Sequence, residues 1–437
     1  MGDDVAGRDP GSGVPLRSWR DDLRLLRERN LGLLVASRLV SDFGTGVAPI
    51  ALAFGVLGLP GGDAQGLGFV LFCAAVPRLL FLLFAGVLAD RVRSRAHLMA
   101  VAEVAAGAAQ LVAAGLFLTG RATVPALAAL AVVNGTAVAV IFPTMSGLMP
   151  QIASGEALQS ANAFVRLSSN IAGILGVAAG GLLVATVGAG WALLIDGVSF
   201  FVSAVLLLLM RSARARTDAD DGPPASVLGD LLHGWHEFTA RRWVWVMVAL
   251  FSLSNFGFTA AIDVLGPVRS LESWGGARGW AVVLTAFSIG TVVGVIGAMR
   301  LRPNRPLLVA LVAQTLVALP LLAMAPPLPL LVVAALAFVS GVCVDIFEVL
   351  WQTTLQQYIP PESLSRVSSY DWLGSMALTP LALATAGALV ATVGLEGALW
   401  ISGLLGSAAS LGLLDPQIRS LRRGRYEDAP SVLPSTA

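Results

Sequence analysis

A succession of long apolar runs is the feature that most constrains what this chain can become. About twelve such runs follow one another, each near the roughly 20 residues that an α-helix needs to cross a bilayer. Charged residues make up only 13% of the 437 residues, whereas a water-soluble domain carries about 25%. We therefore predict an all-α integral membrane protein. The runs lie at 31–59, 66–89, 96–118, 124–149, 161–187, 191–210, 243–266, 277–299, 306–325, 328–351, 367–393 and 398–414.

The basic residues predict the orientation. All 28 are arginine, and most of them fall in segments that the succession of runs places on one side of the membrane. Loops rich in basic residues stay in the cytoplasm. We therefore predict a multi-pass protein of the bacterial inner (plasma) membrane with both termini cytoplasmic. Residues 1–30 are polar, without the apolar region and cleavage site of a signal peptide.

An octet that occurs twice divides the chain into two halves. Residues 181–188 read Gly-Leu-Leu-Val-Ala-Thr-Val-Gly, and residues 387–394 read Gly-Ala-Leu-Val-Ala-Thr-Val-Gly. At the same separation Gln151 matches Gln357. Paired repeats are typical of transporters that bind substrate between them. We predict an N-terminal segment (1–30), a six-helix half (31–210), a cytoplasmic linker with an interfacial helix (211–242), a second six-helix half (243–414) and a cytoplasmic tail (415–437).

A charged hairpin at 86–95 separates the second and third runs. The positions that fit the pattern G-x-L-A-D-R-x-G-R-R are Gly86, Leu88, Ala89, Asp90, Arg91 and Arg95. Arg93 replaces the second glycine, and Ser94 replaces an arginine. The hairpin resembles the loop between the second and third helices of the major facilitator superfamily. Segments 149–162, 191–200 and 365–374 are similar to its enterobactin-exporter-like and macrolide-efflux-like bacterial branch.

This resemblance implies a fold and a mechanism. The fold is about twelve helices in two pseudo-symmetric six-helix halves, and the mechanism is alternating access, commonly export driven by the proton gradient. The resemblance further implies that Asp90 holds the halves together on the cytoplasmic side. Its expected partner is the start of the eleventh helix near Asp371, since a helix N-terminus attracts a carboxylate. Gly86 would permit close helix approach, and Arg91 and Arg95 would anchor the loop.

Glycines in the fifth run resemble the antiporter motif of exporters in the superfamily, g-x-x-x-G-P-x-x-G-G. Gly176, Gly180 and Gly181 match, but Val177 replaces the proline. Small residues at this spacing equally suit close helix packing. The fourth run carries no arginine, whereas many drug–proton antiporters of the superfamily carry one there.

Ionisable residues at mid-membrane depth are candidates for proton coupling, because they are costly to bury. Asp42 lies roughly 17 Å along the first helix at 1.5 Å per residue, with Arg38 one turn earlier on the same face. Arg78 reaches a similar depth in the second helix. Either Asp42 exchanges protons while the arginines tune it, or these residues form a permanently paired cluster that joins helices.

Other carboxylates are open to two interpretations. We expect Glu103 to snorkel or pair near the cytoplasmic interface rather than to exchange protons. Asp345 and Glu348 are three residues apart on the tenth helix and point the same way, so they form either a proton site or a cytoplasmic charge network. Asp196 and Asp263 fall near the outer ends of their helices, where we expect solvation and a structural role.

Polar and aromatic residues predict a central cavity that suits an amphiphilic ligand. Its candidate polar groups are Asn134, Asn170, Asn255 and Gln314, and its candidate walls are Phe142, Phe251, Phe258 and Trp372. Each aromatic ring could instead face lipid or pack in the core.

The leading functional hypothesis is a monomeric, proton-coupled exporter of a bulky amphiphilic molecule such as a drug, a macrolide-like compound or a siderophore. A facilitator or importer of a small metabolite is the alternative. The chain has no lysine for a P-loop, which excludes a Walker-type ATPase. A membrane lipid or prenyl transferase would need clustered metal-binding carboxylates at helix ends. We expect no cofactor, metal or nucleic-acid partner, only the proton gradient, the small-molecule substrate and the bilayer.

Overall fold

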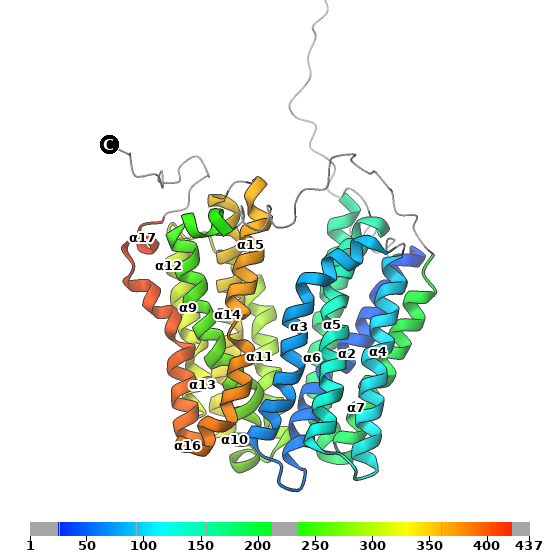
Figure 1. Ribbon diagram of the computed structural model, residues 1–437. Coiled ribbons are helices and arrows are strands. Elements are labelled where there is room, and N and C mark those ends of the chain that lie inside the picture. Colours follow the sequence, from blue (N-terminus) through cyan, green and yellow to red (C-terminus); the bar gives the residue numbers. More distant parts are fainter. Residues whose placement is uncertain are drawn as a thin grey trace, which may run out of the picture.

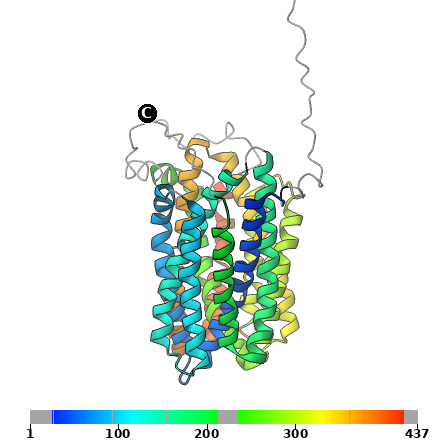
Figure 2. The ribbon, with the colours of Figure 1, turned by 90° about the vertical axis from the view of Figure 1, so that its right-hand side faces the viewer.

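The computed structural model describes residues 25, 27–92, 94–153, 156–211, 235–359 and 361–421, except for the side chains at 82–91, 142, 146–147, 156, 159, 361–362, 365–366 and 420. All regular structure in this part of the chain is helical, which confirms the all-α prediction. The helices run nearly parallel to one direction in both views (Figures 1 and 2). The chain ends described here lie at one end of the bundle, which we call the inner end, and the opposite end is the outer end.

The first half consists of six long helices joined by short turns. Polar side chains cap three of them: Asp63, Ser94 and Thr123 each accept a hydrogen bond from a backbone N–H in the first turn, and such caps satisfy donors that have no partner within the helix. The helices are α2 (Arg29–Leu57), α3 (Ala64–Arg91), α4 (Arg95–Leu118), α5 (Val124–Ile152), α6 (Glu156–Val187) and α7 (Ala189–Leu208).

The second half is more interrupted. Its seventh span contains a π-helical segment, and its ninth and eleventh spans each combine two helices. The elements are α9 (Arg242–Thr259), η1 (Ala260–Leu265), α10 (Gly266–Ser273), α11 (Ala277–Ala298), α12 (Pro306–Val317), α13 (Leu319–Ala323), α14 (Leu330–Tyr358), α15 (Pro361–Met376), α16 (Thr379–Gly406), η2 (Ala408–Leu414) and α17 (Pro416–Ser420).

The repeated octet ends in a turn in both halves. Gly188 adopts φ 91° and ψ 168° between α6 and α7, and Gly394 adopts φ 75° and ψ 170° within α16. Only glycine adopts such angles readily. Eleven segments of the described chain are long and apolar enough to cross a membrane, and the last, Val367–Leu414, has 48 residues. Because Gly394 turns it back, this segment crosses twice, and the total is the predicted twelve.

The two halves lie side by side and approach each other closely near the outer end (Figure 1). Helix α3 packs against α16, and α6 packs against α11. A Cβ atom added to Gly387 would lie 2.2 Å from Cα of Gln65, and one added to Gly181 would lie 2.1 Å from Cβ of Ala281. Gly181 and Gly387 are equivalent positions of the octet, so the repeat supplies the same close contact on both sides of the interface.

The predicted interfacial helix at 226–242 is described only in part. Residues 235–240 are helical, and Trp235 and Phe238 place their rings 5.6 and 5.8 Å from that of Tyr370 in α15. This segment therefore packs on the second half. The rest of the predicted helix, most of residues 1–30 and the tail beyond 421 lie outside the described residues.

Candidate functional site

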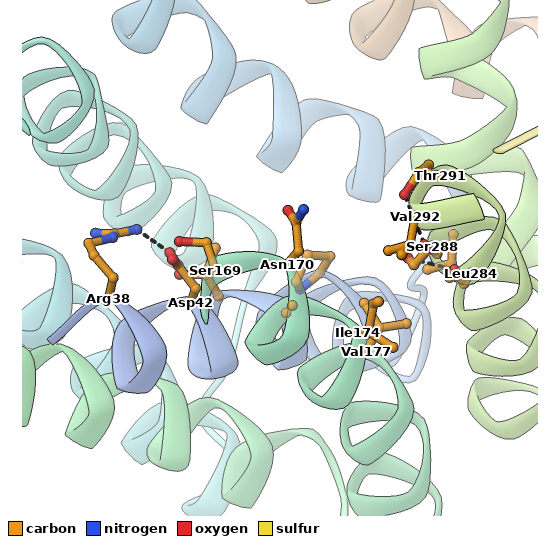
Figure 3. Close-up of a pocket in the computed structure, with 14 residues that line it drawn as sticks. Arg38, Asp42, Ser169, Asn170, Ile174, Val177, Leu284, Ser288, Thr291 and Val292 are labelled. Atoms are coloured by element: carbon orange, nitrogen blue, oxygen red, sulfur yellow. Dashed lines mark hydrogen bonds and ion pairs between the residues drawn. The ribbon is translucent and has the colours of Figure 1, made fainter. Parts of the chain in front are cut away.

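A cavity of about 510 Å³ lies between the two halves. Helices α2 and α6 of the first half and α11 of the second half surround it (Figure 3). Ser169 and Asn170 lie beside Asp42, and Leu284, Ser288 and Val292 face them from α11. The lining residues are Arg38, Asp42, Thr45, Gly46, Pro49, Ser169, Asn170, Gly173, Ile174, Val177, Leu284, Ser288, Thr291 and Val292.

Glycines bring α2 and α6 into backbone contact beside this cavity. A Cβ atom added to Gly176 would lie 2.2 Å from the carbonyl oxygen of Phe43, and one added to Gly180 would lie 3.0 Å from Cα of Val47. With Gly181 packed on α11, all three glycines of the antiporter-like motif occupy tight helix contacts. Packing accounts for their identity, and any further role of the motif stays a prediction.

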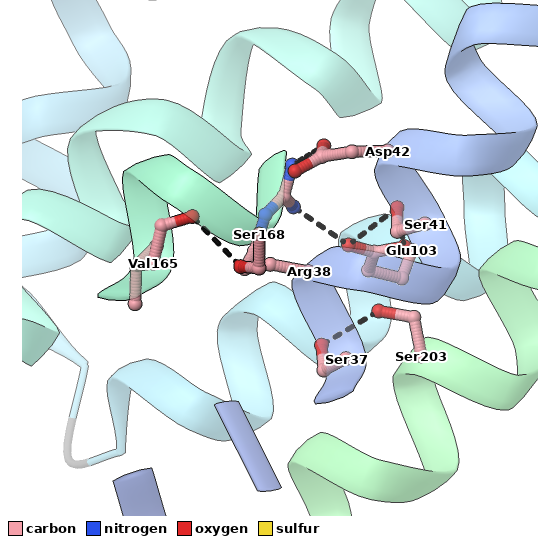
Figure 4. Close-up of polar contacts among 8 residues, drawn as sticks. All are labelled: Ser37, Arg38, Ser41, Asp42, Glu103, Val165, Ser168 and Ser203. Carbon is pink, nitrogen blue, oxygen red and sulfur yellow. Dashed lines mark hydrogen bonds and ion pairs between the residues drawn. The ribbon is translucent and has the colours of Figure 1, made fainter. Parts of the chain in front are cut away.

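Three ionisable side chains from α2 and α4 meet at the inner edge of the cavity (Figure 4). One guanidinium nitrogen of Arg38, Nη2, donates to Asp42 Oδ1, and the other, Nη1, donates to Glu103 Oε1 across 3.3 Å. Ser41 donates to the same carboxylate, with 3.0 Å between its Oγ and Glu103 Oε2. We call Arg38, Asp42 and Glu103 the triad.

Glu103 corrects one expectation and supports another. Its side chain is completely buried, so it does not snorkel to the cytoplasmic interface. It does pair with Arg38, as the same expectation allowed. The partner lies on α2, whereas Glu103 lies on α4, and spacing along the sequence does not show that these two helices are neighbours. The sequence does contain a sign of this contact. Ser37, Arg38, Ser41 and Asp42 form a polar face on α2, and a polar face within an apolar helix predicts a polar partner such as Glu103.

The triad holds two carboxylates against a single guanidinium. When both carboxylates are ionised the cluster carries one net negative charge, in a region where unpaired charge is costly. Asp42 Oδ2 is buried and has no hydrogen-bond partner among the described atoms. Asp42 also lines the cavity, and its carboxylate has one unpartnered oxygen on which a proton could reside.

Arg78 does not join the triad. It lies on the exposed surface of α3, and its charge acts on Asp263 in the π-helical segment η1 of the other half. π-Helical segments occur frequently at functional sites. Asp263 is exposed, as predicted, although it lies in η1 between α9 and α10 rather than at a helix end.

A second cavity, of about 230 Å³, lies within the second half. Among the predicted cavity residues, those that line it are Phe251, Asn255, Phe258, Gln314 and Trp372. Phe251 also packs with Phe347, with 4.5 Å between ring centroids. Only Asn170 of the predicted polar groups lines the cavity between the halves. Asn134 lines neither cavity, and the side chain of Phe142 lies outside the described residues.

Asp371 is not at a helix start, so that prediction was wrong. Helix α15 begins at Pro361, because the polar residues before Asp371 are already helical. The Asp371 side chain is buried and accepts a hydrogen bond from Trp351 Nε1 at 3.0 Å. Nearby, Glu348 accepts from Gln352, and the charge of Arg166 in the first half acts on Asp345.

The cytoplasmic gate stays a prediction. The backbone of α3 extends to Arg91 and Arg95 begins α4, so the hairpin is short, as expected. The side chains of Asp90 and Arg91 and the packing around Gly86 lie outside the described residues, as does all of Arg93.

Comparisons with known proteins agree with this architecture. A family model described as "Major Facilitator Superfamily" matches residues 33–377. Multidrug efflux pump Tap of Mycolicibacterium fortuitum is 26% identical over 384 residues, covering 83% of this chain and 90% of the relative. Tap of Mycobacterium tuberculosis is 27% identical over 396 residues, covering 85% and 90%. The solved nucleoside transporter NupG shares the fold, with a TM-score of 0.70 at 14% identity over 88% of this chain and 98% of NupG.

Proposed function

Because this chain belongs to the Major Facilitator Superfamily, we propose that it is a proton-coupled antiporter that exports a bulky amphiphilic small molecule. It is a multi-pass membrane transporter and not an enzyme. The proposal concerns three properties of this transporter: the direction of transport, the ion that drives it and the chemical class of its substrate. They are supported by the chemistry of the cavity and by relatives named as multidrug efflux pumps.

The observation that carries the proposal is the position of Asp42. It lines the cavity between the halves, it shares Arg38 with buried Glu103, and one of its oxygens has no partner. A carboxylate in this position binds either a proton or a positively charged group of the substrate. Competition for one carboxylate links release of the proton to capture of the substrate, which is the requirement for antiport.

The cavity also supports the substrate class. Its volume of about 510 Å³ lies in the range of about 300–1,000 Å³ that is typical of sites for drug-sized ligands. Ile174, Val177 and Leu284 offer apolar surface, while Asn170 and Asp42 offer a hydrogen-bonding group and a charge. A ligand with an apolar body and a cationic group satisfies both parts.

The conformation supports loading from the cytoplasm. The close contacts between α3 and α16 and between α6 and α11 seal the halves together near the outer end. We propose that the termini are cytoplasmic, so that the closed outer end corresponds to an inward-facing state in which Asp42 collects substrate from the cytoplasm. Rocking of the halves about the glycine contacts would then expose the same cavity to the outside.

The proposal is tested with ethidium, an amphiphilic cation, in inside-out membrane vesicles that contain the transporter. We expect energised vesicles to accumulate ethidium and to release it when a protonophore is added. Vesicles without the transporter are the control. Ethidium entry that is unaffected by the protonophore would support a facilitator instead, and lower vesicle accumulation with higher accumulation in intact cells would support an importer.

A further inference from the structure

A second buried carboxylate lies in the first half, away from the cavity. Asp196 of α7 is completely buried between α2 and α4. Gln110 of α4 donates to its Oδ2 across 2.6 Å, and its Oδ1 has no hydrogen-bond partner. No arginine among the described residues forms an ion pair with it. Asp196 is thus unlike Asp42, whose negative charge Arg38 offsets.

Asp196 packs against the two helices, α2 and α4, that carry the triad. Helix α2 presents Gly44, whose added Cβ would lie 2.7 Å from Oδ1, so the backbone of α2 covers the carboxyl group. Helix α4 carries Gln110 and, two turns towards the inner end, Glu103, whose charge acts on Asp196. Arg38 and Asp42 on α2 face the cavity, and Arg166 of α6 acts on the other half. Glu103 is therefore the ionisable neighbour that matters.

The equivalent position in the second half shows that packing does not require a carboxylate. Ser402 follows Asp196 at the separation of the repeated octet. Ser402 is also completely buried. Gly257 packs against it, as Gly44 packs against Asp196: a Cβ atom added to Gly257 would lie 2.2 Å from the carbonyl oxygen of Ser402. A neutral hydroxyl fills this place in one half, whereas the other half has an acid.

Resting on the proposed function, we propose that Asp196 is a second proton-binding residue of the first half, coupled electrostatically to the triad through Glu103. An ionised carboxylate that is buried without a cation is destabilised, and a proton on Oδ1 makes the site neutral. When Glu103 is ionised, its negative charge favours the proton on Asp196. Protonation of Glu103 removes that charge and makes release of the proton from Asp196 easier.

The first test measures the proton directly. Full-length transporter in liposomes is titrated with base while infrared difference spectroscopy records the carbonyl band of protonated carboxyl groups. We expect Asp196→Asn to lose one band that Ser402→Ala, the matched control in the second half, retains. Asp196→Ser, which copies the residue of the second half, should lose the same band even if the asparagine variant folds poorly. A spectrum unchanged in both Asp196 variants would overturn the proposal.

The second test measures coupling in liposomes with an imposed pH gradient and ethidium as the probe. One coupled proton contributes about tenfold in accumulation for each pH unit. We expect Asp196→Asn and Asp196→Ser to lose that factor while ethidium counterflow without a gradient is unchanged. Wild-type accumulation by both variants would refute a role in coupling. If the wild-type protein itself accumulates no ethidium, the proposed function fails, whereas the infrared bands still decide whether Asp196 binds a proton.

Discussion

Arg38 of α2 donates to Glu103 of α4 across 3.3 Å, and this contact joins a fully buried carboxylate to one that faces the cavity. The same guanidinium holds Asp42. A change of charge on either carboxylate therefore alters the pairing of the other. This shared cation gives the first half a physical means of linking events in the cavity to its own interior.

Asp42 is the first residue to test. We expect Asp42→Asn to abolish proton-driven ethidium accumulation, because an amide cannot exchange a proton with the cavity, while the protein is still produced and inserted. The measurement is accumulation in inside-out vesicles with equal amounts of transporter. Glu272→Gln, which removes a half-exposed carboxylate at the outer end, is the matched control. Normal accumulation by the Asp42 variant would exclude Asp42 as the coupling residue.

Glu103 is expected to matter for stability as well as for coupling. Glu103→Ala removes one of the two carboxylates that Arg38 pairs with and leaves the Ser41 hydroxyl without its acceptor. A buried hydrogen-bonding group left unsatisfied costs about 1–3 kcal/mol. Glu103→Gln keeps an acceptor for Ser41 and should be destabilised less. Thermal unfolding of the purified protein in detergent gives the order wild type, Glu103→Gln, Glu103→Ala. Equal unfolding temperatures for all three would contradict the hydrogen bonds described here.

The equivalent glycines at the interface of the halves predict a conformational effect. In the Gly181→Leu variant the new side chain would clash with Ala281 of α11. Overpacking of this kind costs about 1–3 kcal/mol, and it destabilises only the state in which the outer end is closed. A cost of about 1.4 kcal/mol shifts the population about tenfold towards the outward-open state.

Labelling measures this shift. Cys73 and Cys343 are first replaced, and a single cysteine is placed in the cavity by Ser288→Cys. A membrane-impermeant maleimide added outside should label this cysteine faster in the Gly181→Leu variant than in the protein that keeps Gly181. Gly115→Leu is the control, because no atom lies within 4 Å of its added Cβ. Unchanged labelling would mean that the Gly181 contact does not hold the outer end closed.

The gate residue predicted from family resemblance gives a separate expectation. Asp90→Asn should slow transport without changing the range of compounds exported, because the backbone of Asp90 belongs to the last turn of α3, at the inner end of the bundle. Initial rates for several cationic dyes provide the measurement. A changed dye profile at an unchanged rate would refute a gating role.

The sequence alone determined the features that depend on local chemistry. Run length predicted the twelve crossings, and the spacing of Arg38 and Asp42 placed them on one face of one helix, close enough to pair. Each rests on residues that are close along the chain, so helical geometry is sufficient to place them.

Only the tertiary structure decided which helices share an interior. Glu103 was expected near an interface and Asp196 near a solvated helix end, yet both are completely buried. Asp371, expected at a helix start, instead accepts a hydrogen bond from Trp351. Neighbouring apolar helices pack by the fit of small residues such as Gly44 and Gly176, and this fit between distant segments has no periodic signal in the sequence. The choice of partner for each buried charge follows from that packing.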